Sequence, residues 1–172
     1  SEQFLADQKL LPAILNAAGE DLARIVFTSS YGHFNSSLDF DDLGLEEGYS
    51  TLKAYGRSKL MNLLTARELQ NRLAGKSVVA SSFHPGAVRT PIWKKGGLLA
   101  CLLGIILYPF MKSVVRGSAT FIWLASSEDL ASKGAGGHYF YEGKRADTAK
   151  FATDEDAKRL WQISEELVAP YC

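Results

Sequence analysis

Two side chains four positions apart, Tyr55 and Lys59, could together carry out acid–base chemistry. Within a helix this spacing places both side chains on one face, one turn apart. A lysine ammonium beside a phenol favours the phenolate, and a tyrosine in such a setting can donate and accept a proton near neutral pH. Most tyrosines with a lysine four positions later have no such role. The pair therefore indicates a site only if further groups meet it.

A hydroxyl at Ser30 could complete such a site. Residues 24–28 form a short, β-rich run that predicts a buried strand, and the serines Ser29 and Ser30 follow directly. Active sites of open α/β sheets form at the carboxyl ends of strands, where Ser30 could hydrogen-bond a carbonyl oxygen. An ordinary alternative stays open, because serine is also a common turn residue. A serine hydrolase is disfavoured, since no G-x-S-x-G elbow surrounds Ser30.

The elements that must position these residues alternate between helices and strands. Apolar residues recur with helical period in four stretches, about 3–18, 50–73, 113–125 and 153–168. Runs typical of strands stand at 24–28, 77–83 and 138–141, whereas the polar stretch 33–49 predicts a surface loop. Strands alternating with long helices imply a parallel sheet covered on both faces. The sequence therefore predicts an α/β fold.

Three blocks of the sequence together resemble the short-chain dehydrogenase/reductase family. They are RIVFTSS at 24–30, YGRSK at 55–59 and HPGAVRT at 84–90, in the family's order on a strand end, a helix and a strand end. The tail GGHYF at 136–140, followed by Trp161, is similar to the retinol-dehydrogenase-like branch. The resemblance covers nearly the whole chain, and the three motifs together are highly specific. It implies a Rossmann-like parallel sheet with flanking helices.

The resemblance also implies an activity and roles for single residues. The reaction is reversible hydride transfer between NAD(P)H and a carbonyl/alcohol pair. Tyr55 is then the general acid/base, Lys59 favours its phenolate and binds the nicotinamide ribose, and Ser30 polarises the substrate carbonyl. Ser29 is the structural neighbour, or the catalytic serine if the assignment shifts by one residue. The stretch along the nicotinamide contains Pro85, Gly86, Val88 and Thr90, with Thr90 near the carboxamide.

The cofactor is expected to be NADP or NAD, with NADP slightly preferred by family analogy. The family's cofactor half begins with a strand and a glycine-rich turn that holds the pyrophosphate, and no such turn precedes Ser30. We therefore expect an incomplete Rossmann-like fold, in which residues 1–172 are the C-terminal portion of a single domain and the N-terminal βαβ half is missing. Two interpretations stay open: part of an active oxidoreductase, or a truncated, inactive interaction or membrane-associated module.

The apolar stretch 97–111 is shorter than the ~20 residues that a membrane-spanning helix needs. It occupies the position of the family's substrate lid, which favours a lipophilic substrate such as a retinoid, a steroid or a lipid aldehyde. The basic residues around it are Lys94, Lys95, Lys112 and Arg116. These could face lipid headgroups in a peripheral membrane contact. A buried lid or a dimer contact is the alternative.

Composition narrows the partners and the location. Nineteen basic and nineteen acidic residues give no basic excess, so nucleic acid is not an expected partner. The cysteines Cys101 and Cys172 make no disulfide framework and fit a reducing compartment or plain packing. The expected location is intracellular, at the endoplasmic reticulum or another organelle membrane surface, or in the cytoplasm. A homodimer is expected only by analogy with the family.

The histidines give no indication of a metal site. His33, His84 and His138 are scattered and lack the spacing of metal ligands. Packing or hydrogen bonding is the expected role of each, and no metal is expected.

Overall fold

The computed structural model describes residues 2–18, 22–89, 108–130 and 134–171. The predicted helices are present as α1 (Glu2–Ala18), α2 (Thr51–Arg72), α5 (Val114–Ser126) and α6 (Asp154–Val168). The predicted strands are β1 (Ala23–Thr28), β2 (Val78–His84) and β3 (Tyr139–Tyr141), joined by a short β4 (Lys144–Arg145). The alternation of strands and helices confirms the α/β prediction.

The strands form one sheet in the order β1-β2-β3-β4. β1 pairs with β2 in parallel, with Phe27 opposite Ser82, and β2 pairs with β3 in parallel. β4 is antiparallel to β3 and was not predicted. The turn before β4 has positive φ at both Glu142 and Gly143, and glutamate rarely adopts this conformation, so the sequence carries no usual hairpin signal.

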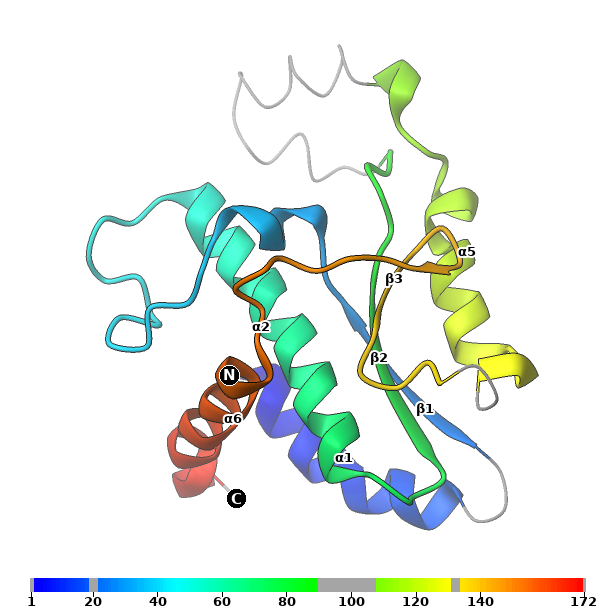
Figure 1. Cartoon of the computed structure of the whole chain (residues 1–172), viewed down its shortest axis with the longest axis horizontal. Coiled ribbons are helices and arrows are strands. Elements are labelled where there is room, and N and C mark those ends of the chain that lie inside the picture. The colour runs from blue at the N-terminus through cyan, green and yellow to red at the C-terminus, as the bar shows by residue number, and fades with distance from the viewer. Residues whose placement is uncertain (1, 19–21, 90–107, 131–133, 172) are drawn as a thin grey trace.

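Helices cover both faces of the sheet, as Figure 1 shows with α2 and α5 on opposite sides of the crossing strands. Alternate residues of β1 face α1, α2 and α6, and a buried cluster there includes Phe27, Leu69 and Trp161. The neighbouring positions face α5, where Val26 packs against a cluster that contains Leu124. This alternation gives the three layers that the pattern predicted.

The stretch 33–49 is only partly the surface loop that its polarity predicted. Residues Tyr31–Asn35 form a 3-10 helix, η1, in which His33 is fully buried. Leu45 is buried as well, and Phe40 packs against a core cluster. Apolar residues spaced irregularly among acidic ones give no periodic signal, so this packing could not be predicted from the pattern.

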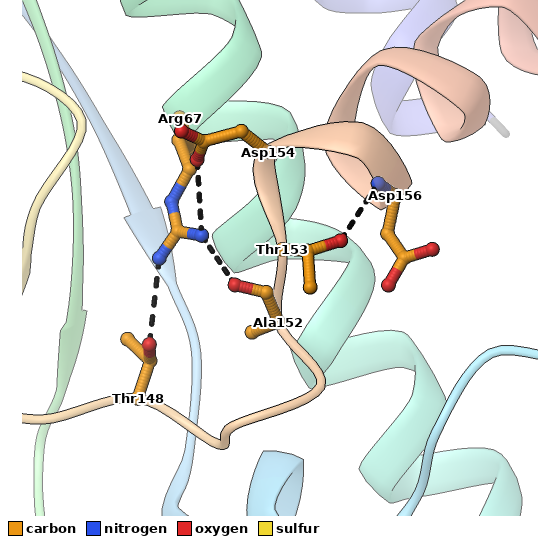
Figure 2. A network of polar contacts seen from close by, with 6 residues as sticks. All are labelled: Arg67, Thr148, Ala152, Thr153, Asp154 and Asp156. Atoms are coloured by element: carbon orange, nitrogen blue, oxygen red, sulfur yellow. Dashed lines mark hydrogen bonds and ion pairs between the residues drawn. The ribbon is translucent and has the colours of Figure 1, made fainter.

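Arg67 of α2 ties the segment before α6 to the body of the fold (Figure 2). Its guanidinium donates to the carbonyl oxygen of Ala152, to Thr148 Oγ1 at 3.4 Å, and to Asp154 Oδ1 at 3.4 Å. At the start of α6, Thr153 Oγ1 accepts from the amide of Asp156 at 3.0 Å. One half-buried cation therefore fixes the position from which α6 begins.

Replacing Arg67 by methionine is expected to lower the free energy of unfolding by about 1–3 kcal/mol, because a half-buried network loses its donor and leaves acceptors unpaired. Urea unfolding of the variant and the wild type measures this difference. Arg116→Met, at an exposed position of α5, is the matched control and should stay near the wild type. Equal urea midpoints for Arg67→Met and the control would show that the hydrogen bonds of Arg67 do not stabilise the fold.

Among the helices that the structure describes, none combines the length and the apolar character needed to cross a bilayer.

Candidate active site

Tyr55 and Lys59 lie on one face of α2, close to its first turn. The Lys59 ammonium is 5.6 Å from the centre of the Tyr55 ring. Tyr55 is 45% exposed, so its ring is within reach of a ligand, whereas Lys59 is half-buried. The helical spacing has thus placed the ammonium beside the phenol ring, as the sequence predicted.

The end of β1 holds the ammonium in place. Lys59 Nζ donates to the carbonyl oxygen of Thr28 at 3.4 Å, and Asn62 Nδ2 donates to the same oxygen at 2.9 Å. Burial lowers the pKa of Lys59. Asn62 did not emerge from the sequence, although its position three residues after Lys59 places it on the same helix face.

The two serines after β1 have different surroundings. Ser29 is 1% exposed, and its hydroxyl donates to the carbonyl oxygen of Lys59 at 2.7 Å, which links β1 to α2. Ser30 is partly exposed, and its Oγ accepts from the amide of Gly32 at 3.2 Å. A hydroxyl that accepts in this way keeps its own hydrogen for donation. The geometry therefore favours Ser30 over Ser29 as the serine that meets a ligand.

Two glycines let η1 approach Tyr55 closely. A Cβ on Gly32 would lie 3.1 Å from Cε1 of Tyr55, and one on Gly56 would lie 2.8 Å from the carbonyl oxygen of Gly32. Real Cβ atoms avoid the second distance, so a side chain at Gly56 would push η1 and α2 apart. The segment that carries Ser30 is packed in this way against the ring of Tyr55.

Tyr55 lines a cleft of about 510 Å³ together with the loop after β2. Of the residues predicted from the sequence, Pro85, Gly86 and Val88 line this cleft with it. Lys59 and Ser30 are not among the lining residues. Lys59 donates to the carbonyl oxygen of Thr28, which lines the cleft, and Ser30 accepts from Gly32, which packs against the ring of Tyr55. Thr90 and most of the stretch 97–111 lie outside the described residues. The remaining lining is mainly apolar: Thr28, Phe83, Ala87, Val114, Gly117, Ser118 and Phe121.

The loop after β2 has a conformation that suits glycine. Gly86 has φ +86, a region that L side chains rarely adopt. His84 Nδ1 accepts from the Gly86 amide at 3.3 Å, and its ring stacks on Tyr141 with centroids 5.1 Å apart. Burial, with a smaller contribution from the Lys112 charge, lowers the pKa of His84 to about 4. The neutral ring is therefore the form that supports this loop.

His33 supports the other side of the site. Its Nδ1 is 2.6 Å from the carbonyl oxygen of Ser30, and its Nε2 accepts from the amide of Ala149 at 3.3 Å. Because Nε2 accepts, Nδ1 carries the hydrogen and donates to Ser30. Burial lowers the pKa of His33, so this neutral tautomer persists near neutral pH.

Acidification is expected to destabilise the fold through His84. The folded-state pKa of about 4 lies below the ordinary value of 6.5, so the unfolded chain binds the proton more readily. The stabilising contribution is complete above pH 6.5 and is lost as pH falls toward 4, by at most about 3 kcal/mol. His84→Asn, which keeps an acceptor near the Nδ1 position, should flatten the pH dependence of urea unfolding. If the unfolding free energies of variant and wild type fell in parallel with pH, His84 would not be the cause of the loss.

No family model matches the chain. The chain is 37% identical over 169 residues to human retinol dehydrogenase 14, covering 96% of this chain and 49% of that protein. It is 41% identical over 166 residues to mouse retinol dehydrogenase 12, covering 96% and 51%. To the short-chain dehydrogenase TIC 32 B, chloroplastic, of Brassica napus it is 34% identical over 173 residues, covering 96% and 53%. Relatives of this chain are thus named as retinol dehydrogenases and as a short-chain dehydrogenase.

A solved structure gives the same result for the fold. An uncharacterized protein from Mycobacterium paratuberculosis superimposes with a TM-score of 0.62 at 27% identity, over 86% of this chain and 51% of that one. The resemblance to the short-chain dehydrogenase/reductase family and its retinol-dehydrogenase-like branch is confirmed, and the sheet is part of a Rossmann-like α/β fold. The chain spans about half the length of the curated relatives it matches.

Proposed function

We propose that this chain carries the acid–base and nicotinamide-facing part of an NAD(P)-dependent oxidoreductase that interconverts a carbonyl and an alcohol. The observation that carries the proposal is the meeting of Tyr55 with Pro85, Gly86 and Val88 around one cleft. Residues 1–172 then correspond to the C-terminal portion of a single short-chain dehydrogenase/reductase domain, with 97–111 as its apolar lid.

The residues at the cleft fit a flat ring such as nicotinamide, which is uncharged in its reduced form. Gly86 presents backbone without a side chain, Pro85 and Val88 offer apolar surface, and the Lys59 ammonium stands one helical turn behind Tyr55. Bound nicotinamide would supply the hydride for the reaction. The cofactor is NADP or NAD, and NADP is our first choice by analogy with the family.

The proton chemistry belongs to the chain's own residues. In the direction of reduction, Tyr55 donates its hydroxyl proton to the oxygen that was the substrate carbonyl, and the Lys59 ammonium favours the phenolate that remains. Ser30 donates a hydrogen bond to the same oxygen, which lowers the energy of the charge that develops there. His33 holds the backbone of Ser30 in place through the carbonyl oxygen. In the oxidative direction Tyr55 accepts the alcohol proton.

The substrate is a lipophilic carbonyl or alcohol. We place retinoids first among the candidate classes, ahead of steroids and lipid aldehydes. Three apolar side chains of the cleft, Phe83, Val114 and Phe121, support this choice, as do two relatives that are named retinol dehydrogenases. Peripheral membrane contact through 97–111, a homodimer, and a location at the endoplasmic reticulum or another organelle surface belong to the same proposal.

Activity of the protein translated from the whole reading frame that contains this chain tests the proposal. With reduced cofactor, retinal should be consumed faster than a small, hydrophilic aldehyde. Ser30→Ala should lower the rate by about 10²–10³-fold, because one hydrogen-bond donor to the developing charge is lost. Ser126→Ala, at an exposed position near the end of α5, is the control. Absence of cofactor oxidation with any carbonyl would overturn the proposal in favour of an inactive interaction module.

A further inference from the structure

Lys112 contacts the cleft loop through its backbone. Its amide donates to the carbonyl oxygen of Ala87 at 2.8 Å, and its carbonyl oxygen accepts from the amide of Arg89 at 3.0 Å. These bonds make a parallel bridge between Val88 and Lys112. Two segments far apart in sequence are thus joined directly beside Gly86, the glycine of positive φ in the cleft lining.

The side chain of Lys112 packs on Gly86. A Cβ on Gly86 would lie 3.1 Å from Lys112 Cδ and 3.1 Å from its Nζ, so the stem lies along the backbone of the glycine. The ammonium donates to Tyr141 Oη at 3.1 Å and pairs with Glu142 Oε1 at 2.6 Å. Burial lowers the pKa of Lys112, but hydrogen bonds and charge interactions with Glu142 and Tyr141 together outweigh it and raise that pKa, so the side chain is charged near neutral pH.

Tyr141, the last residue of β3, contacts both His84 and Lys112. Its ring stacks on His84, and the Lys112 ammonium lies 4.3 Å from the centre of the same ring. His84 in turn accepts from the Gly86 amide. Gly86 is therefore contacted by both Lys112 and His84, and Tyr141 contacts both of these residues.

We propose that Lys112, held by Tyr141 and Glu142, is a positioning residue that fixes the loop Gly86–Val88 in the conformation that receives the nicotinamide end of the cofactor. The inference rests on the proposed function. The ion pair with Glu142 is partly exposed, since Glu142 is 60% and Lys112 23% exposed, and pairs of this kind add little to global stability. Removing the charge should therefore alter the loop far more than the stability of the fold.

Three variants test the role of Lys112. Lys112→Met keeps an aliphatic stem without the charge, Lys112→Arg restores a cation, and Glu142→Gln removes the anionic partner. In this chain without cofactor, the amides of Gly86 and Arg89 should exchange hydrogen about tenfold faster in Lys112→Met, at an unchanged urea midpoint. Lys112→Arg should be near the wild type and Glu142→Gln intermediate. Lys158→Met, at an exposed position of α6, is the matched control.

In the protein from the whole reading frame, Lys112→Met should raise KM for the reduced cofactor by about tenfold and change kcat far less, since a misplaced loop weakens binding before chemistry. Unchanged amide exchange in Lys112→Met overturns the inference whatever the activity. Faster exchange with an unchanged cofactor KM also overturns it. Failure of the proposed function is distinguishable, because there the wild-type protein itself is inactive.

Discussion

Replacing Tyr55 by phenylalanine is expected to lower the rate of carbonyl reduction by at least about 10²-fold, because the group that we propose as the proton donor is lost. Affinity for the reduced cofactor should stay near that of the wild type. The ring that lines the cleft is retained, and Lys59 keeps its hydrogen bond to the carbonyl oxygen of Thr28. Steady-state rates and a fluorescence titration with reduced cofactor, both on the protein from the whole reading frame, measure the two effects.

The control for this substitution is Tyr49→Phe. Tyr49 is also exposed and lies in the loop that precedes α2, outside the cleft lining. The same hydroxyl is removed there without contact to the proposed site, so the rate should be unchanged. A Tyr55→Phe enzyme as active as Tyr49→Phe would show that Tyr55 is not the acid/base.

Replacing Leu64 by alanine is expected to lower the free energy of unfolding by about 3 kcal/mol, because a large buried side chain leaves a cavity. Leu64 is 0% exposed at the middle of α2 and belongs to a buried cluster with Tyr139 and Leu160. A sheet of four strands has a limited core, so a loss of this size would be a large part of the total stability.

Leu52→Ala is the matched control for this loss. Leu52 is on the same helix but 82% exposed, so the same truncation removes little buried surface. Urea unfolding of both variants gives the difference directly. Equal stability of the two variants would mean that α2 does not pack on the sheet as described. The measurement matters for the site as well, because α2 carries Tyr55 and Lys59.

Much of the fold could be predicted from local patterns. The period of apolar residues in 50–73 predicted α2, and Pro85 after an apolar run predicted where β2 stops. The pairing of Tyr55 with Lys59 followed from helical spacing alone. Ser29 and Ser30 could not be separated by residue type, and burial separates them: Ser29 is bonded inside the fold, whereas Ser30 is partly exposed.

Contacts between distant segments could not be predicted from the pattern. From the sequence, Lys112 is a basic residue beside an apolar stretch, with lipid headgroups as candidate partners. In the fold its ammonium pairs with Glu142 and its stem covers Gly86. Asn62 and His33 carry no motif either, and each gains its role because β1, η1 and α2 meet at one place. Such contacts depend on tertiary packing, which the local periodicity of a sequence does not reveal.

Transfer of an isotope from cofactor to substrate tests the central claim most directly. The protein from the whole reading frame is incubated with retinal and reduced cofactor that carries deuterium at the transferable position of the nicotinamide, and the product is analysed by mass spectrometry. We predict retinol with one deuterium at the former carbonyl carbon from the wild type, and almost no product from Tyr55→Phe. Product without deuterium, or equal labelled product from both proteins, would contradict a hydride transfer assisted by Tyr55.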